Sequence, residues 1–135
     1  MALQYSVAIR NGQLDSLETT IGTDAILKIR TGAQPADVAT ADSGTALATL
    51  QLPSDWMAAA ASGVKAKSGT WEDLSADATG IAAHFRVYAS DGTTAHIQGS
   101  VTATGGGGQM TVANTTFATG QPVTVTTFSI TAGNA

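Results

Sequence analysis

The chain has 135 residues, no cysteine, 15 glycines and a net charge of −4. This length is typical of one domain, and the lack of cysteine excludes disulfide bonds, cysteine-based zinc sites and thiol nucleophiles. Lys and Arg together number only six, too few for the basic patch that binds nucleic acid, so we expect no nucleic-acid partner. We also expect no membrane association, because no apolar stretch approaches the roughly 20 residues of a membrane span and no signal peptide is recognisable.

The charged fraction is 12%, about half of the roughly 25% that soluble domains average. A weakly charged surface rich in Ala and Thr favours a protein that covers part of its surface by association. A monomer with a Thr-rich surface remains the alternative.

Residues 3–21 have the apolar spacing of an amphipathic helix. The predicted apolar face consists of Leu3, Val7, Leu14, Leu17 and Ile21, and the predicted polar face of Arg10, Asn11, Gln13, Asp15 and Glu18. Gly22 is well placed to end the helix, and Gly12 marks a weak point or a kink. Residues 1–22 therefore form a predicted helical arm, which either packs on its own sheet or docks on a neighbouring subunit.

After Gly22 the apolar period changes from helical to that of strands. Strands are predicted at residues 25–30, with Leu27 and Ile29 facing inward, and at residues 46–52. A short helix is predicted near residues 54–62, with Ser54 as N-cap and Gly63 as terminator. In the next strand, from residue 64, Val64 and Ala66 share one face and Lys65 and Lys67 the other.

The clearest pattern is a hairpin formed by residues 81–89 and 93–103 around Ser90-Asp91-Gly92. A three-residue loop with a left-handed Gly92 places Phe85 opposite Ile97 and Arg86 opposite His96, so that apolar and polar faces agree.

The glycine run 105–108 is predicted to be a mobile connection, and the last strand, 122–131, to contain a bulge near Thr126 and Thr127. Several short strands without alternating helices predict a mainly β fold. We expect an antiparallel β-sandwich of jelly-roll type at residues 23–135, forming one folding unit with the arm.

No enzyme, cofactor or metal site is predicted. His84 and His96 are expected on the outward face of the hairpin, and no catalytic or phosphate-binding motif is present. Glu72, Asp73 and Asp77 provide oxygen ligands in one loop, but they lack the spacing of an EF-hand, so a solvated loop is expected.

Trp56 and Trp71 are the candidate recognition aromatics. Each is either an interface anchor or a core residue. A glycan-binding sandwich usually exposes several aromatic side chains on one face, and the sequence does not supply three.

Several segments resemble small virion proteins of tailed bacteriophages, and this similarity spans the chain. The segments are Ala2-Leu3-Gln4-Tyr5-Ser6-Val7-Ala8-Ile9-Arg10-Asn11, Leu14-Asp15, Ile21-Gly22, Leu52-Pro53-Ser54-Asp55-Trp56, Gly69-Thr70-Trp71, His84-Phe85-Arg86-Val87-Tyr88 and the Thr-rich tail ending Asn134-Ala135. Within this group the chain looks most like the capsid cement, or decoration, proteins of short-tailed phages. The resemblance implies a jelly-roll homo-oligomer, with a dimer favoured, that binds the major capsid protein on the outer surface of the capsid.

The residues expected to contribute to association are Tyr5, Arg10 and Trp56, chosen for their segments and aromatic character. Two other functions stay open: a tail or collar component of the virion, and an adhesion module that binds glycans or a receptor.

Overall fold

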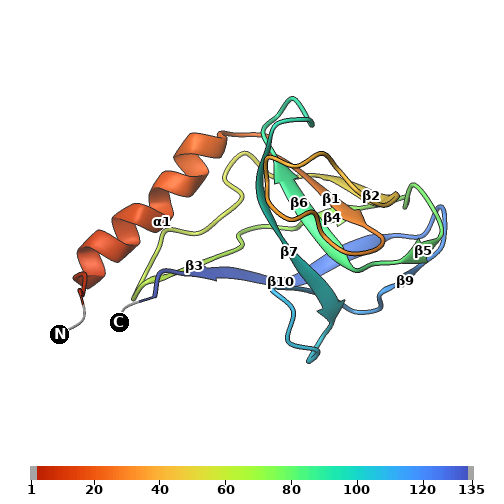
Figure 1. The fold of residues 1–135 in the computed structure, drawn as a ribbon. Coiled ribbons are helices and arrows are strands. Elements are labelled where there is room, and N and C mark those ends of the chain that lie inside the picture. The colour runs from red at the N-terminus through yellow and green to blue at the C-terminus, as the bar shows by residue number, and fades with distance from the viewer. Residues whose placement is uncertain (1–2, 134–135) are drawn as a thin grey trace.

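The computed structural model describes residues 3–133, and its fold is mainly β, with 37% of the chain in strands and 11% in helix. This confirms the predicted class. The elements run in the order α1 (Val7–Ile21), β1 (Ile26–Arg30), β2 (Ala46–Gln51), β3 (Val64–Ala66), β4 (Glu72–Asp73), β5 (Gly80–Ile81), β6 (His84–Tyr88), β7 (Ala95–Ala103), β8 (Met110–Val112), β9 (Thr116–Phe117) and β10 (Val123–Thr131) (Figure 1).

Most strands belong to one curled sheet with the order β2-β1-β6-β7-β8-β10-β3, and β4 also pairs with β10. The two ends of this sheet approach each other, because the Thr49 amide of β2 donates to Asp73 Oδ2 of β4 at 3.0 Å. The Asp77 amide, just beyond β4, donates to the Leu47 carbonyl at 2.7 Å. The strands β5 and β9 form a separate ribbon. This connectivity does not confirm a sandwich of jelly-roll type.

The pair β7 and β8 is parallel, although only residues 104–109 connect the two strands. Parallel neighbours usually need a connection of about a dozen residues. Here the glycine run lets the chain fold back tightly: a Cβ on Gly106 would lie 2.7 Å from Thr102 Cβ, and one on Gly108 would lie 2.9 Å from Thr102 Cγ2. Gly106 and Gly108 of the predicted mobile connection are thus packed against β7.

The core lies inside the curled sheet and contains both tryptophans, which are fully buried. Trp56 and Trp71 have ring centroids 6.0 Å apart, and Phe128 lies 5.5 Å from Trp71 and 5.4 Å from Phe85. The predicted inward residues of β1, Leu27 and Ile29, are also buried.

The hairpin of β6 and β7 forms, but its predicted register is wrong by two residues. Phe85 pairs with Gly99 and Arg86 with Gln98. At the bulge between Val87 and Tyr88, His96 is the extra residue of β7. Gly92 is left-handed as predicted, with φ 70°. The loop is longer than predicted because the Ala89 amide already bonds the Thr94 carbonyl at 3.0 Å. Gly99 faces Phe85 because a Cβ there would lie 2.8 Å from the ring.

The predicted helix near residues 54–62 is wrong: α1 is the only helix in the part of the chain that the structure describes. The backbone of this segment instead forms isolated bridges, Met57 to Lys67 and Ala61 to Val64. Pairing with the following strand therefore overrides the helix propensity of the alanine run. The bulge in β10 is confirmed, since the register with β8 shifts between Val125 and Thr127.

Candidate functional site

The ends of α1 are set by local hydrogen bonds. Ser6 Oγ accepts from the Ile9 amide at 3.2 Å, and the helix ends where the Gly22 amide donates to the Glu18 carbonyl at 2.8 Å. Gly22 has φ 91°, which only glycine adopts cheaply. The predicted C-terminal glycine is confirmed, whereas the helix begins at Val7, four residues later than the predicted Leu3. Residues 1–2 of the predicted arm lie outside the described residues.

The helix docks on the rest of the protein with polar side chains. Asn11 Oδ1 accepts from the Gly63 amide at 2.9 Å, Asp15 Oδ1 from the Ala60 amide at 2.9 Å, and Glu18 Oε1 from the Met57 amide at 3.2 Å. These amides lie in an irregular segment, and buried backbone donors need partners. Most of the predicted apolar face is not packed on the sheet: of its five members, only Leu14 and Ile21 are buried.

Lys65 lies at the centre of this contact and is 2% exposed. Its Nζ donates to Asp15 Oδ1 at 2.7 Å and to the Ala58 carbonyl at 3.0 Å, and lies 3.2 Å from Glu18 Oε2. Burial by itself would lower the pKa of Lys65, but the hydrogen bonds to Asp15 and Glu18 outweigh burial and raise it. The hydrogen bonds from Lys65 and from the Ala60 amide also hold the pKa of Asp15 below its usual value. Lys65 and Asp15 are therefore charged at neutral pH.

A hollow lies on each side of α1. One, of about 460 Å³, is lined by Asp15, Glu18, Asp55, Met57 and Lys65 among others. The other, of about 370 Å³, is mainly apolar and is lined by Leu17 together with Phe85, Ile97, Phe128 and Ile130 of the sheet. Apart from the buried Leu14 and Ile21, the helix is thus held mainly by its polar contacts.

Four apolar side chains at the start of the chain are exposed, and we call them the N-terminal apolar row. They are Leu3 (73% exposed), Tyr5 (41%), Val7 (46%) and Ile9 (51%). No charged residue interrupts residues 3–9. The start of α1 and the end of the chain lie at the same end of the molecule (Figure 1).

The three predicted association residues do not form one surface. Tyr5 belongs to the N-terminal apolar row. Arg10 is half-buried, and its Nη1 donates to the Ala132 carbonyl at 3.4 Å. Trp56 is fully buried, with Nε1 donating to the Gly22 carbonyl at 3.1 Å, so it cannot contact a partner. It instead anchors the segment that follows α1.

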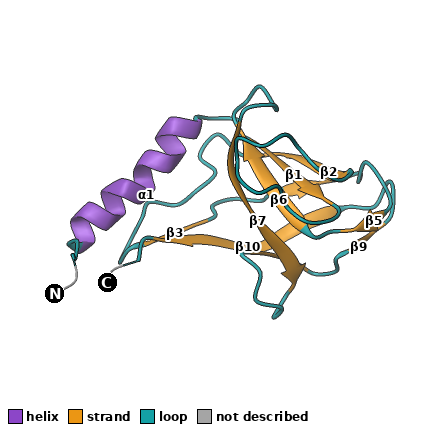
Figure 2. Cartoon of the chain, in the orientation of Figure 1, coloured by secondary structure: helices purple, strands orange, loops and turns teal. Residues whose placement is uncertain are grey.

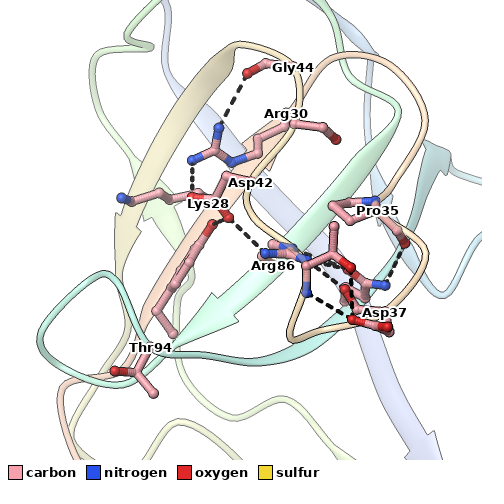
Figure 3. Close-up of polar contacts among 12 residues, drawn as sticks. Lys28, Arg30, Pro35, Asp37, Asp42, Gly44, Arg86 and Thr94 are labelled. Atoms are coloured by element: carbon pink, nitrogen blue, oxygen red, sulfur yellow. Dashed lines mark hydrogen bonds and ion pairs between the residues drawn. The ribbon is translucent and has the colours of Figure 1, made fainter.

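A second polar cluster fixes the loop of residues 32–44 to the sheet (Figure 3). The Asp42 carboxylate accepts hydrogen bonds from Arg30 and Arg86 at 2.9 Å each and from the Tyr88 hydroxyl at 2.7 Å. Burial would raise the pKa of Asp42, but these partners lower it overall. Arg86 also donates to the Asp37 carbonyl, and Gln98 to the Pro35 carbonyl.

His84 lies inside the protein, not on the predicted outward face, and is 1% exposed. Its Nδ1 is 2.8 Å from the Gly32 carbonyl, so Nδ1 carries the proton, and Nε2 has no partner. Burial lowers the pKa of His84, and the positive charges of Arg30 and Arg86 add to this effect. The strand β6 is buried on both faces, which explains the error. His96 is exposed as predicted, although it does not face Arg86.

Two of the acidic residues at 72–77, Asp73 and Asp77, have structural partners. Asp73 accepts from Thr49 of β2, as described above, and Asp77 Oδ2 accepts from the Thr49 hydroxyl at 2.7 Å. Among residues 3–133, no group of three or more His, Asp or Glu side chains is placed to hold a metal ion.

Sequence reasoning missed Lys65, Asp42 and Arg86, which hold α1 and the loop 32–44. The alternation in residues 64–67 gives no sign that the lysine face is the buried one. Asp42 and Arg86 bond to each other across 44 residues of sequence, so no local spacing predicts their contact.

No helix in the described part of the chain combines the length and apolar character needed to cross a membrane. Comparison with protein-family models, with curated proteins and with solved structures gives no match in any of the three.

Proposed function

We propose that this protein is a structural component of a tailed-phage virion that binds the outside of the capsid and stabilises contacts between capsomers. Its partner in this proposal is the major capsid protein, and its own assembly is a homodimer. The proposal extends the resemblance of the sequence to capsid decoration proteins, including their jelly-roll architecture as a finer description of the mainly β fold.

The observation that carries the proposal is the N-terminal apolar row. Leu3, Val7 and Ile9 are about half exposed or more, and the segment carries no charge. Exposed apolar side chains that adjoin one another are typical of a surface that binds another protein. Ile9 lies on the side of α1 opposite to Asn11, Asp15 and Glu18, which fasten the helix to the body. Val7 lies one turn before Asn11, at the exposed N-terminal end of the helix.

The rest of the molecule suits a part that is used in many copies. A small apolar contact is weak alone, but two linked contacts on a symmetric shell raise the overall affinity by orders of magnitude. The cluster around Asp42 and the side-chain contacts between β2 and β4 hold the loops on the sheet. A body restrained in this way loses little conformational entropy on binding.

The test is to mix the purified protein with expanded capsids that lack it, and to measure binding by sedimentation and imaging. We expect stoichiometric occupancy of regular sites on the shell. A chain with Val7→Glu and Ile9→Glu should bind at least about tenfold more weakly, because two buried apolar side chains contribute several kcal/mol. Both substitutions place acidic residues in the first turn of α1, where the helix dipole favours them, so the fold is retained.

The matched control is Ile81→Glu, which removes an exposed apolar residue (64% exposed) from β5, far from the start of α1 (Figure 1). It should bind like the unmodified protein. Absence of binding to capsids would contradict the proposal. Binding to isolated tails or collars, or to arrayed glycans, would instead assign the tail, collar or adhesion function.

A further inference from the structure

The contact between α1 and the rest of the protein depends on charge more than on apolar area. Lys65 Nζ lies 2.7 Å from Asp15 Oδ1 and 3.2 Å from Glu18 Oε2, and is almost completely buried. A buried ammonium without a carboxylate partner is strongly unfavourable. The buried position of Lys65 therefore requires an acidic helix over it, but nothing in this geometry requires the helix to come from the same chain.

The apolar part of the contact is small. Only Leu14 and Ile21 of α1 are buried, and hollows of about 460 Å³ and 370 Å³ lie on either side of the helix. Figure 2 shows α1 beside loop segments and β3, away from the main face of the sheet. Moving the helix as a unit therefore disturbs little of the core.

The segment that joins α1 to β1 is short and strained. It consists of residues 22–25, and two of them have left-handed backbones: Gly22 with φ 91° and Asp24 with φ 57°. A non-glycine residue in this region carries a conformational cost. An extended segment would remove that cost, although it would also break the hydrogen bonds that Trp56 and Gln51 donate to the Gly22 and Asp24 carbonyls. Short strained hinges are the feature that favours exchange of elements between identical chains.

We propose that α1 is exchanged between two copies of this chain, so that Asp15 and Glu18 of each copy hold Lys65 of the other. The charge complementarity of Lys65 with the acidic side of α1 identifies the second copy's helix as the occupant. This inference specifies how the homodimer of the proposed function is built and uses no contact with the capsid, because it depends on Asp15 and Glu18 and not on the N-terminal apolar row.

The main test uses two full-length variants with opposite defects. One carries Lys65→Glu in the body, and the other carries Asp15→Lys and Glu18→Lys in the helix. In each variant alone, every helix meets a body of like charge, whether the helix is exchanged or not. In a mixture, exchange creates two complementary contacts: the native helix on the native body, and the substituted helix on the substituted body.

After co-expression with different affinity tags, we expect a one-to-one heterodimer by light scattering, and neither variant should form a dimer alone. The control is a single chain with all three substitutions, whose helix again matches its own body and should dimerise like the unmodified protein. Failure to recover a heterodimer from the mixture, with that control folded, would overturn the proposal.

The second measurement needs no change in charge. Asp24→Gly removes the backbone strain of the closed hinge and so favours the monomer. Each dimer contains two hinges, so we expect the dimer dissociation constant to rise at least about tenfold. An unmodified protein that is monomeric at every concentration, or a dissociation constant that Asp24→Gly leaves unchanged, would also overturn the exchange.

Discussion

Lys65 and His84 are both almost completely buried, yet the protein holds them in opposite charge states. Lys65 has the carboxylates of Asp15 and Glu18 within 3.2 Å and stays protonated. His84 lies near Arg30 and Arg86, has a carbonyl at Nδ1 and no partner at Nε2, and stays neutral. The difference follows from the neighbours, because burial disfavours the charged form of both residues.

The neutral state of His84 makes folding stability depend on pH. Its folded pKa lies below the usual 6.5, so below that pH the unfolded chain binds a proton that the folded protein does not. The contribution of neutral His84 to the free energy of unfolding is fully present above pH 6.5 and is lost as the pH falls toward the folded pKa. We expect the free energy of unfolding to decrease between pH 7.5 and 5, with a slope approaching about 1.4 kcal/mol per pH unit.

Urea unfolding at several pH values in this range measures the effect. His84→Asn retains a donor for the Gly32 carbonyl but has no proton to bind, so its stability should vary less with pH. His96→Asn, at an exposed position, should keep the pH dependence of the unmodified protein. An equally steep dependence in His84→Asn would assign the effect to another group.

Among the elements, α1 has ends that are set by local hydrogen bonds and an orientation that is set by tertiary contacts. Ser6 and Gly22 set its ends through hydrogen bonds within the segment. Gly12 does not interrupt it: the helix is continuous over Val7–Ile21. The polar side faces the body because its side chains accept hydrogen bonds from the Met57, Ala60 and Gly63 amides and from Lys65.

Gly12→Ala should stabilise the protein by about 1 kcal/mol, because alanine has the higher helix propensity and the position is exposed. A Cβ there meets no atom within 4 Å. The measurement is the urea midpoint. Gly99→Ala is the opposing control, since its Cβ would lie 2.8 Å from the Phe85 ring and overpacking typically costs about 1–3 kcal/mol. Destabilisation by Gly12→Ala would show that this position needs glycine for a reason other than space.

At the scale of the whole molecule, the body is a sheet whose ends meet through side chains. Thr49 of β2 bonds Asp73 of β4 and also Asp77, so β2 is covered along one edge. Covering an edge in this way prevents pairing with another chain. The core enclosed by this sheet includes Trp56 and Trp71 and receives only a small contribution from α1.

This arrangement predicts that residues 23–135 fold without α1. Removing residues 1–22 should lower the free energy of unfolding by about 3–6 kcal/mol, the loss expected for the burial of Leu14 and Ile21, while circular dichroism keeps its β character. Leu3→Ser is the control: it changes a side chain that is 73% exposed and lies before Ser6 and the docked helix, and it should leave stability nearly unchanged. An unfolded 23–135 fragment would show that the arm is part of the folding unit.

Several features depend only on residues close together in the chain and can be predicted from the sequence alone. These are the mainly β class, the end of α1 at Gly22, the left-handed Gly92, the inward Leu27 and Ile29 of β1, and the bulge near Thr126. Each follows from backbone conformation or from a regular alternation within one segment.

The buried faces and the strand pairs depend on contacts between residues that are far apart in the sequence. Lys65 is inside because Asp15 and Glu18, about 50 residues earlier, neutralise its charge. The observed hairpin register differs from the predicted one by two residues, because Gly99, and not Ile97, leaves room for the Phe85 ring. Residues 54–62 do not form the predicted helix, because β3 and α1 supply hydrogen-bond partners for their backbone groups. In each case the deciding partner is distant in sequence, so no local pattern contains it.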